Sequence, residues 1–247
     1  MSRERWEAFL AKVQARADEI CAEADAGFDG LIAAEVMDPV PLASAMSELH
    51  ARMMGLEKKI DESWDKLDLD GDALRAQGTQ LKQRIARQSK ALQVTKAAKA
   101  ARAVQKLAQA EMAKSVQCSS CGGPLEPTVR HEASNVTCPH CKAVSVVRPG
   151  MATLMLYGGG CLHAFGEEAA LDESVRLEAA VERWHAAREK RRSDVDAYVQ
   201  AHRSYWLVYA RGYGACVPGW TEAKSRELAE AKLGFLKYEL ERTRIED

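Results

Sequence analysis

Residues 118–141 read CSSCGGPLEPTVRHEASNVTCPHC, and this stretch separates two long segments of helical character. Cys118 and Cys121 form one C-x2-C pair, Cys138 and Cys141 form a second, and sixteen residues lie between the pairs. Each pair forms a tight turn that aims two sulfurs at one point, so this spacing is typical of a four-thiolate metal site. The sequence therefore predicts that these four cysteines are metal ligands.

The residues around the two turns predict a small β structure. Gly122 and Gly123 directly follow the second cysteine, where the turn needs a residue that tolerates a positive φ. Short strands are expected at residues 116–118, 124–130, 134–137 and 143–148. Two structural disulfides are the alternative interpretation of the same four cysteines.

The segment 116–148 resembles a zinc ribbon of the rubredoxin-knuckle type. The resemblance covers about one eighth of the chain, and it implies a bound metal and a small fold but no activity. Zinc is the expected ion, and iron is the alternative because a tetrahedral four-thiolate site accepts both.

Composition limits the class of protein. The chain has 247 residues, of which 47% are hydrophobic, so it can bury a core, and its formal net charge is −1. No apolar run has the length that a bilayer requires, and the N-terminal residues are polar with a helical pattern, unlike a signal peptide. With seven cysteines and no export signal, we expect a cytoplasmic protein that does not contact the membrane.

Outside the four-cysteine segment, apolar residues recur at helical spacing. Helices are expected at residues 2–26, 42–67, 73–115, 167–209 and from Thr221 onward, with the heptad pattern of a coiled coil in 42–67. The helices before and after the four-cysteine segment each have about 43 residues, which is roughly 65 Å of helix. The predicted fold is mainly α, an elongated antiparallel helical bundle or coiled coil with an inserted small β zinc ribbon.

Four regions follow from this pattern. They are an N-terminal helical region at 1–115, a four-cysteine zinc ribbon at 116–148, a glycine-containing connector at 149–166 and a C-terminal helical hairpin at 167–247.

Charge is unevenly distributed along the chain. Residues 73–110 contain no Asp or Glu and nine basic residues, whereas residues 1–72 carry a net charge of −9. The basic helix is a candidate for contact with anions or nucleic acid. The candidate contact residues are Lys82, Arg84, Arg87, Lys90, Lys96, Lys99, Arg102 and Lys106. Pairing with the acidic helices of the same chain is the alternative, and no aromatic residue is present in this helix to stack on bases.

The layout resembles two groups of bacterial proteins. A long hairpin with an acidic tip at Asp68, Asp70 and Asp72, next to a four-cysteine module, resembles transcription factors that insert a coiled-coil hairpin into the RNA polymerase secondary channel. The layout is also similar to coiled-coil and zinc-ribbon adaptors of secretion and motility systems. The first family has no equivalent of the helical residues after the ribbon, and in the second the ribbon is terminal.

Other motifs lack essential members. Residues 66–77 imitate a calcium loop, but Lys66 and Gln77 occupy the positions of its strongest ligands. Glu182-Arg-Trp-His185 matches one Glu-x-x-His element of a di-iron bundle, and the second element is absent from the sequence. Cys161 is expected at a helix N-terminus, which would lower the pKa of its thiol, but His163 is only two residues away and cannot share one helix face with it. Cys216 has no obvious local base. An enzyme that uses either thiol is a third hypothesis.

We therefore expect a non-enzymatic scaffold or adaptor that binds other proteins, with homo-oligomerisation through the heptad pattern as one form of binding. The alternative is a transcription-associated or nucleic-acid-binding protein that uses the basic helix 73–110 and the zinc ribbon.

Overall fold

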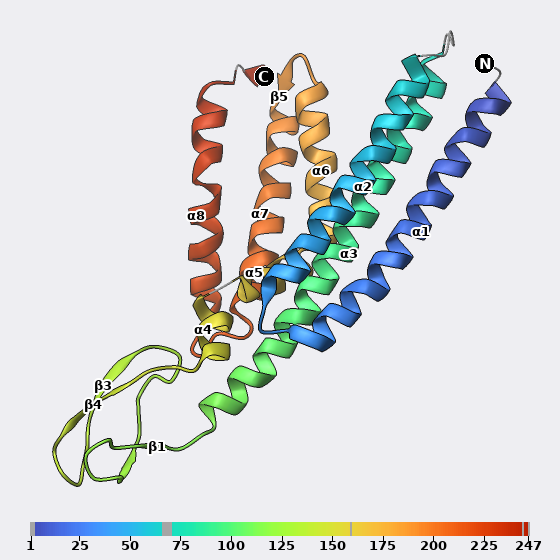
Figure 1. Ribbon diagram of the computed structural model, residues 1–247. Coiled ribbons are helices and arrows are strands. Elements are labelled where there is room, and N and C mark those ends of the chain that lie inside the picture. Colours follow the sequence, from blue (N-terminus) through green and yellow to red (C-terminus); the bar gives the residue numbers. More distant parts are fainter. Residues whose placement is uncertain (1–2, 66–70, 159, 244, 247) are drawn as a thin grey trace. The chain divides into compact units, whose positions relative to one another are not determined.

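A computed structural model describes residues 3–65, 71–158, 160–243 and 245–246 of the chain (Figure 1). The described chain is mainly helical, with two small antiparallel sheets next to the cysteines, as the sequence predicts. It divides into two compact units, residues 1–96 and residues 97–247. Helix α3 (Asp72–Met112) contributes its first part to the first unit and its last part to the second.

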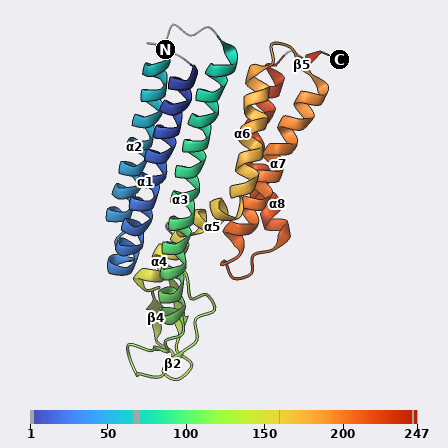
Figure 2. The ribbon, with the colours of Figure 1, turned by 90° about the vertical axis from the view of Figure 1, so that its right-hand side faces the viewer.

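In the first unit, α1 (Arg3–Glu35) and α2 (Pro39–Asp65) lie beside the first part of α3 (Figures 1 and 2). The central part of the predicted heptad pattern in α2 is buried, since Leu49, Met53, Leu56 and Ile60 are all at most 5% exposed. These side chains form one core with those of α1 and with Leu81 and Ile85 of α3. Their spacing of four and three residues keeps one face of α2 against its neighbours.

The predicted end of the first helix at Gly27 is wrong, because α1 continues to Glu35. Phe28 and Ile32 extend the apolar stripe and are 1% and 9% exposed. A glycine within a helix costs about 1 kcal/mol, and burying two large apolar side chains outweighs that cost. After the turn, Pro39 begins α2, where its missing N–H is tolerated, and the Asp38 carboxylate accepts a hydrogen bond from the Val40 amide at 2.9 Å.

The second unit contains the four-cysteine module, residues 116–148. Strands β1 (Val116–Gln117) and β2 (Pro124–Leu125) pair antiparallel, and so do β3 (Ser134–Thr137) and β4 (Val144–Val147). The register of the second pair places Asn135 opposite Val146 and Thr137 opposite Val144. Strand β2 ends at Leu125, so the predicted strand over 124–130 is much shorter than expected.

The connector predicted at 149–166 is largely helical. It contains α4 (Met151–Gly158) and the first residues of α5 (Cys161–Ala169). Gly166 of α5 and Gly212 of α7 (Arg192–Gly214) lie where these two helices approach each other closely. A Cβ at Gly212 would be only 2.6 Å from the carbonyl oxygen of Phe165.

The long helix predicted at 167–209 is also wrong. The chain forms α6 (Leu171–Ala186), reverses direction, and continues as α7 (Arg192–Gly214), with the short strand β5 (Lys190–Arg191) between them (Figure 1). The Lys190 ammonium donates hydrogen bonds to the carbonyl oxygens of Trp184 and Ala187, which satisfies the end of α6. The Trp184 and Tyr198 rings then stack across the reversal, with centroids 4.7 Å apart.

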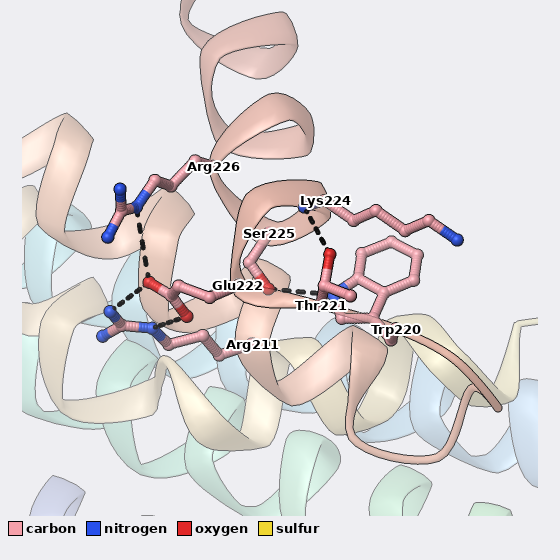
Figure 3. Close-up of polar contacts among 7 residues, drawn as sticks. All are labelled: Arg211, Trp220, Thr221, Glu222, Lys224, Ser225 and Arg226. Carbon is pink, nitrogen blue, oxygen red and sulfur yellow. Dashed lines mark hydrogen bonds and ion pairs between the residues drawn. The ribbon is translucent and has the colours of Figure 1, made fainter.

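The predicted last helix is confirmed as α8 (Glu222–Glu241), followed by the short strand β6 (Ile245–Glu246), which pairs with β5. Figure 3 shows the start of α8, where the Thr221 hydroxyl accepts a hydrogen bond from the Lys224 amide at 3.3 Å. The Trp220 indole N–H donates to the Ser225 hydroxyl, and the Arg211 guanidinium binds the Glu222 carboxylate through two nitrogens. A threonine cap and an acidic residue in the first turn explain why this boundary was predictable.

Candidate metal centre

The two C-x2-C pairs form matching turns. The Cys118 amide donates to the Gly123 carbonyl at 2.8 Å, and the Gly122 amide donates to the Cys118 carbonyl at 2.9 Å. In the second turn, the Cys138 amide donates to the Ala143 carbonyl at 2.8 Å, and the Lys142 amide to the Cys138 carbonyl at 3.1 Å. Each pair of thiols is therefore held by its own local hydrogen bonds.

The fourth residue after the first cysteine of each pair has a positive φ. Gly122 has φ 72° and Lys142, at the equivalent place, has φ 64°. The predicted need for a residue tolerant of positive φ at Gly122 is confirmed. The second turn adopts the same conformation with a lysine, at the steric cost of a Cβ in the left-handed region.

The four sulfurs converge. All four Sγ atoms lie within 4.8 Å of one another, with Cys118–Cys141 at 3.7 Å and Cys121–Cys138 at 3.6 Å. A tetrahedral zinc ion with bonds of about 2.3 Å holds its sulfurs about 3.8 Å apart, so these residues fit such an ion. Every cysteine is a free thiol, which excludes the disulfide alternative for this structure.

Local dipoles favour the thiolate form of one cysteine in each pair. The backbone amides of Cys121 and Ser120, with the Ser145 hydroxyl, lower the pKa of Cys118 to about 6. The amides of Cys141 and His140 likewise lower the pKa of Cys138.

The pKa of Cys121 shifts in the opposite direction. The Gly123 amide lowers its pKa, but the adjacent thiols of Cys141 and Cys138 outweigh that effect, and the pKa rises to about 12. Four thiols in contact cannot all ionise without a cation, because each added thiolate repels the others. A divalent ion supplies the missing charge.

The module is fastened to the ends of α3 and α4. The Arg130 guanidinium donates to the carbonyl oxygens of Met112 and Lys114 at 2.6 and 2.9 Å, and so satisfies the C-terminus of α3. The His131 ring lies 4.7 Å from the Tyr157 ring of α4, centroid to centroid. His140 is exposed, and neither histidine belongs to the sulfur cluster.

Glu111, in the last turn of α3, caps the N-terminus of α4. Its carboxylate accepts hydrogen bonds from the Ala152 amide at 3.2 Å, the Thr153 amide at 2.9 Å and the Thr153 hydroxyl at 2.9 Å. Burial acts to raise the pKa of Glu111, but these hydrogen bonds outweigh it and the pKa is lowered. The roles of Glu111 and Arg130 were not predictable from sequence, because both side chains bind backbone groups that are distant in sequence.

Several basic residues of α3 pair with acidic side chains. Lys82 binds Asp61 at 2.6 Å, and Lys96, whose side chain is 7% exposed, binds Asp25 and Asp29 at 2.8 and 2.5 Å. In the second unit, Arg102 binds Glu168 through two nitrogens at 2.5 and 2.8 Å. Arg87, Lys90 and Lys99 also interact with other groups of the protein, whereas Arg84 and Lys106 are exposed.

The remaining thiols lie in apolar or hydrogen-bonded surroundings. Burial raises the pKa of Cys161 at the start of α5 and that of Cys21 in the core of the first unit. Burial also raises the pKa of Cys216, although Gln105 donates a hydrogen bond to its sulfur at 3.1 Å. His163 forms a hydrogen bond with the Tyr209 hydroxyl.

Two of the three remaining sequence motifs fall partly on residues that the structure does not describe. Asp68, Asp70 and Lys66, which belong to the predicted acidic tip and the calcium-loop pattern, lie outside the described residues. His185 is exposed at the end of α6, and among the described residues no second metal-binding cluster includes it or Glu182.

No protein-family model, curated protein or solved structure matches this chain significantly. Within the described ranges, no helix combines the length and the apolar character that crossing a bilayer requires.

Proposed function

We propose that this chain is a non-enzymatic scaffold or adaptor that binds other proteins, and that a structural zinc ion holds its four-cysteine module. The convergence of four thiols supports this proposal, because four protein ligands fill a tetrahedral site and leave no position for a substrate. The bound ion would supply charge neutralisation and local folding energy to a module whose own core is small.

The electrostatics favour a protein partner over nucleic acid. Lys82, Lys96 and Arg102 are engaged with carboxylates, so their positive charge is compensated within the chain. Phosphate binding requires basic side chains that are free to displace counterions. The antiparallel coiled-coil arrangement and homo-oligomerisation through the heptad pattern stay predictions of the sequence.

The raised pKa values of Cys161 and Cys216 support the non-enzymatic assignment, because a thiol nucleophile needs a lowered pKa. Four thiolates that bind a metal persist in a reducing compartment, so we propose a cytoplasmic location.

Metal analysis and in-cell crosslinking test the proposal together. Purified full-length protein should contain about one equivalent of zinc for its single four-thiol cluster. Iron in its place would give a coloured protein. The Cys138→Ser variant should lose the metal and its crosslinked protein partner, and Cys21→Ser, which alters a thiol outside the cluster, should keep both. Native protein with less than about half an equivalent of any metal would refute the metal site. A partner captured equally by both variants would refute the role of the module.

A further inference from the structure

Exposed apolar side chains are concentrated at β4 and α4. Val144 is 63% exposed, Val146 61%, Met151 66% and Leu154 48%. Among the described residues, seven large apolar side chains are at least 48% exposed, and these four of them fall within eleven consecutive positions. Isolated exposed apolar residues are ordinary, but a local concentration of this kind marks an interaction surface.

The two valines do not belong to the core of the four-cysteine module. Strand side chains alternate, so Ser145 and Val147 of β4 face the module, where Ser145 is buried and its hydroxyl contacts Cys118. Val144 and Val146 face the other way. Their partners across the hairpin are Thr137 and Asn135, and both are exposed.

We call the side chains of Asn135, Thr137, Val144 and Val146 the outer face of the hairpin. Within the described part of the chain, β3 and β4 pair only with each other. Each strand therefore has one edge without a partner strand, and such an edge offers backbone N–H and C=O groups to an added strand.

The charged side chains of the hairpin itself, residues 134–148, have one sign. Residues 133–166 contain no Asp or Glu. Lys142 precedes β4 and Arg148 follows it, and both are exposed. Arg148 lies two residues beyond Val146, so the alternation of the strand continues the row of Val144 and Val146 into a guanidinium. A segment that lies along this row meets apolar surface in its middle and positive charge at both ends.

We propose that an acidic, extended segment of a partner protein adds a strand to the β3–β4 hairpin and packs apolar side chains on Val144 and Val146. The inference rests on the proposed adaptor function and specifies its partner surface. The free strand edge provides main-chain hydrogen bonds, the valines provide apolar contact, and Lys142 and Arg148 select acidic residues. The module's metal site holds the hairpin in place without occupying its outer face.

Peptide display on the zinc-loaded full-length protein tests this inference. The probe is a library of short random peptides, and the enriched sequences should be acidic and should alternate apolar with polar residues. A synthetic peptide of the enriched sequence should bind the Val144→Thr/Val146→Thr variant at least roughly tenfold more weakly, which is about 1.4 kcal/mol. Arg148→Glu should also weaken binding, and added salt should weaken binding to the unaltered protein.

The controls separate loss of the surface from loss of the fold. Threonine keeps the branched Cβ of valine, so the variant should retain its zinc content. Val40→Thr, which alters a 68% exposed valine of α2, should leave peptide binding unchanged. Three results would overturn the inference: no enriched peptide, enriched peptides with helical spacing or basic composition, or binding that is indifferent to the two valines.

Two other occupants would also overturn it. Self-association of the full chain that disappears in the valine variant would assign the face to a second copy. Salt-sensitive binding of RNA or DNA that depends on Arg148 would assign it to nucleic acid. A crosslinked partner that requires Cys138 but not the valines would leave the adaptor function standing and refute only this inference.

Discussion

Glu111 should stabilise the start of α4 by about 1–2 kcal/mol, the typical contribution of a side chain that caps a helix N-terminus. Its carboxylate accepts three hydrogen bonds from Ala152 and Thr153, and hydrogen bonds to a charged group contribute about 1.5–3 kcal/mol. The lower range is expected here because Glu111 is only partly buried. Glu111→Ala should therefore increase local opening of α4 about 5- to 30-fold, as measured by hydrogen exchange of the amides in residues 151–158.

Gly150 provides a matched second variant. A Cβ at Gly150 would lie 2.4 Å from the Glu111 carboxyl carbon, so Gly150→Ala should displace the carboxylate and produce a similar loss of protection. With Glu111→Ala already present, the added methyl group meets no carboxylate. Gly150→Ala should then be neutral, or stabilising by up to about 1 kcal/mol through reduced unfolded-state entropy.

Additive losses in the double variant would refute this account of the cap, and so would unchanged exchange in Glu111→Ala. Glu126→Ala, at an exposed position after β2, is the control and should leave exchange in α4 unaltered. The pKa of Glu111 is lowered in the folded protein, so its stabilisation is present above the ordinary carboxyl pKa near 4.5. The difference between wild type and Glu111→Ala should shrink as the pH falls below that value.

Three further outcomes are expected. Residues 122 and 142 both have positive φ, which a side chain with a Cβ disfavours. Gly122→Ala should therefore destabilise the module by about 1–2 kcal/mol, whereas Lys142→Gly should stabilise it by up to about 1 kcal/mol. Chelator competition for the metal measures the change in each variant. Burial lowers the pKa of His202, whose ring nitrogens have no hydrogen-bond partner. As the pH falls below 6.5, the unfolded chain therefore binds a proton before the folded chain does, and the unfolding free energy of the second unit should decrease. Urea titrations should show this decrease in the unaltered protein and not in His202→Phe. Lys96→Met should cost about 1–2 kcal/mol, because Asp25 and Asp29 each lose the ion pair with Lys96. Thermal unfolding measures this difference, and high salt should reduce it.

The metal ligands were predictable because their information is local. Each C-x2-C pair closes its turn with hydrogen bonds among residues 118–123 or 138–143, so spacing alone implies the geometry. The start of α8 was predictable for the same reason, since Thr221 caps the helix within its own first turn. The heptad spacing of α2 also identified its buried face correctly.

Helix ends that depend on distant groups were not predictable. Residues 187–191 read Ala-Arg-Glu-Lys-Arg and contain no glycine or proline that would signal a helix end. The break there depends on Lys190 folding back onto the end of α6 and on Trp184 stacking with Tyr198. In the opposite sense, Gly27 resembled a helix end, but the burial of Phe28 and Ile32 carries α1 past it. Both errors arise because tertiary packing outweighs local propensity.

The four sulfurs of the metal centre differ in exposure, since Cys118 and Cys138 are buried whereas the residues Cys121 and Cys141 are exposed. A chelator or an oxidant can therefore approach the metal centre from one side only. It contacts Cys121 and Cys141 first, while the hairpins shield the other two thiols. An ion leaving by this route would part from the accessible pair before the sheltered pair. Stepwise release of this kind makes the lifetime of the loaded module sensitive to anything that covers that one side.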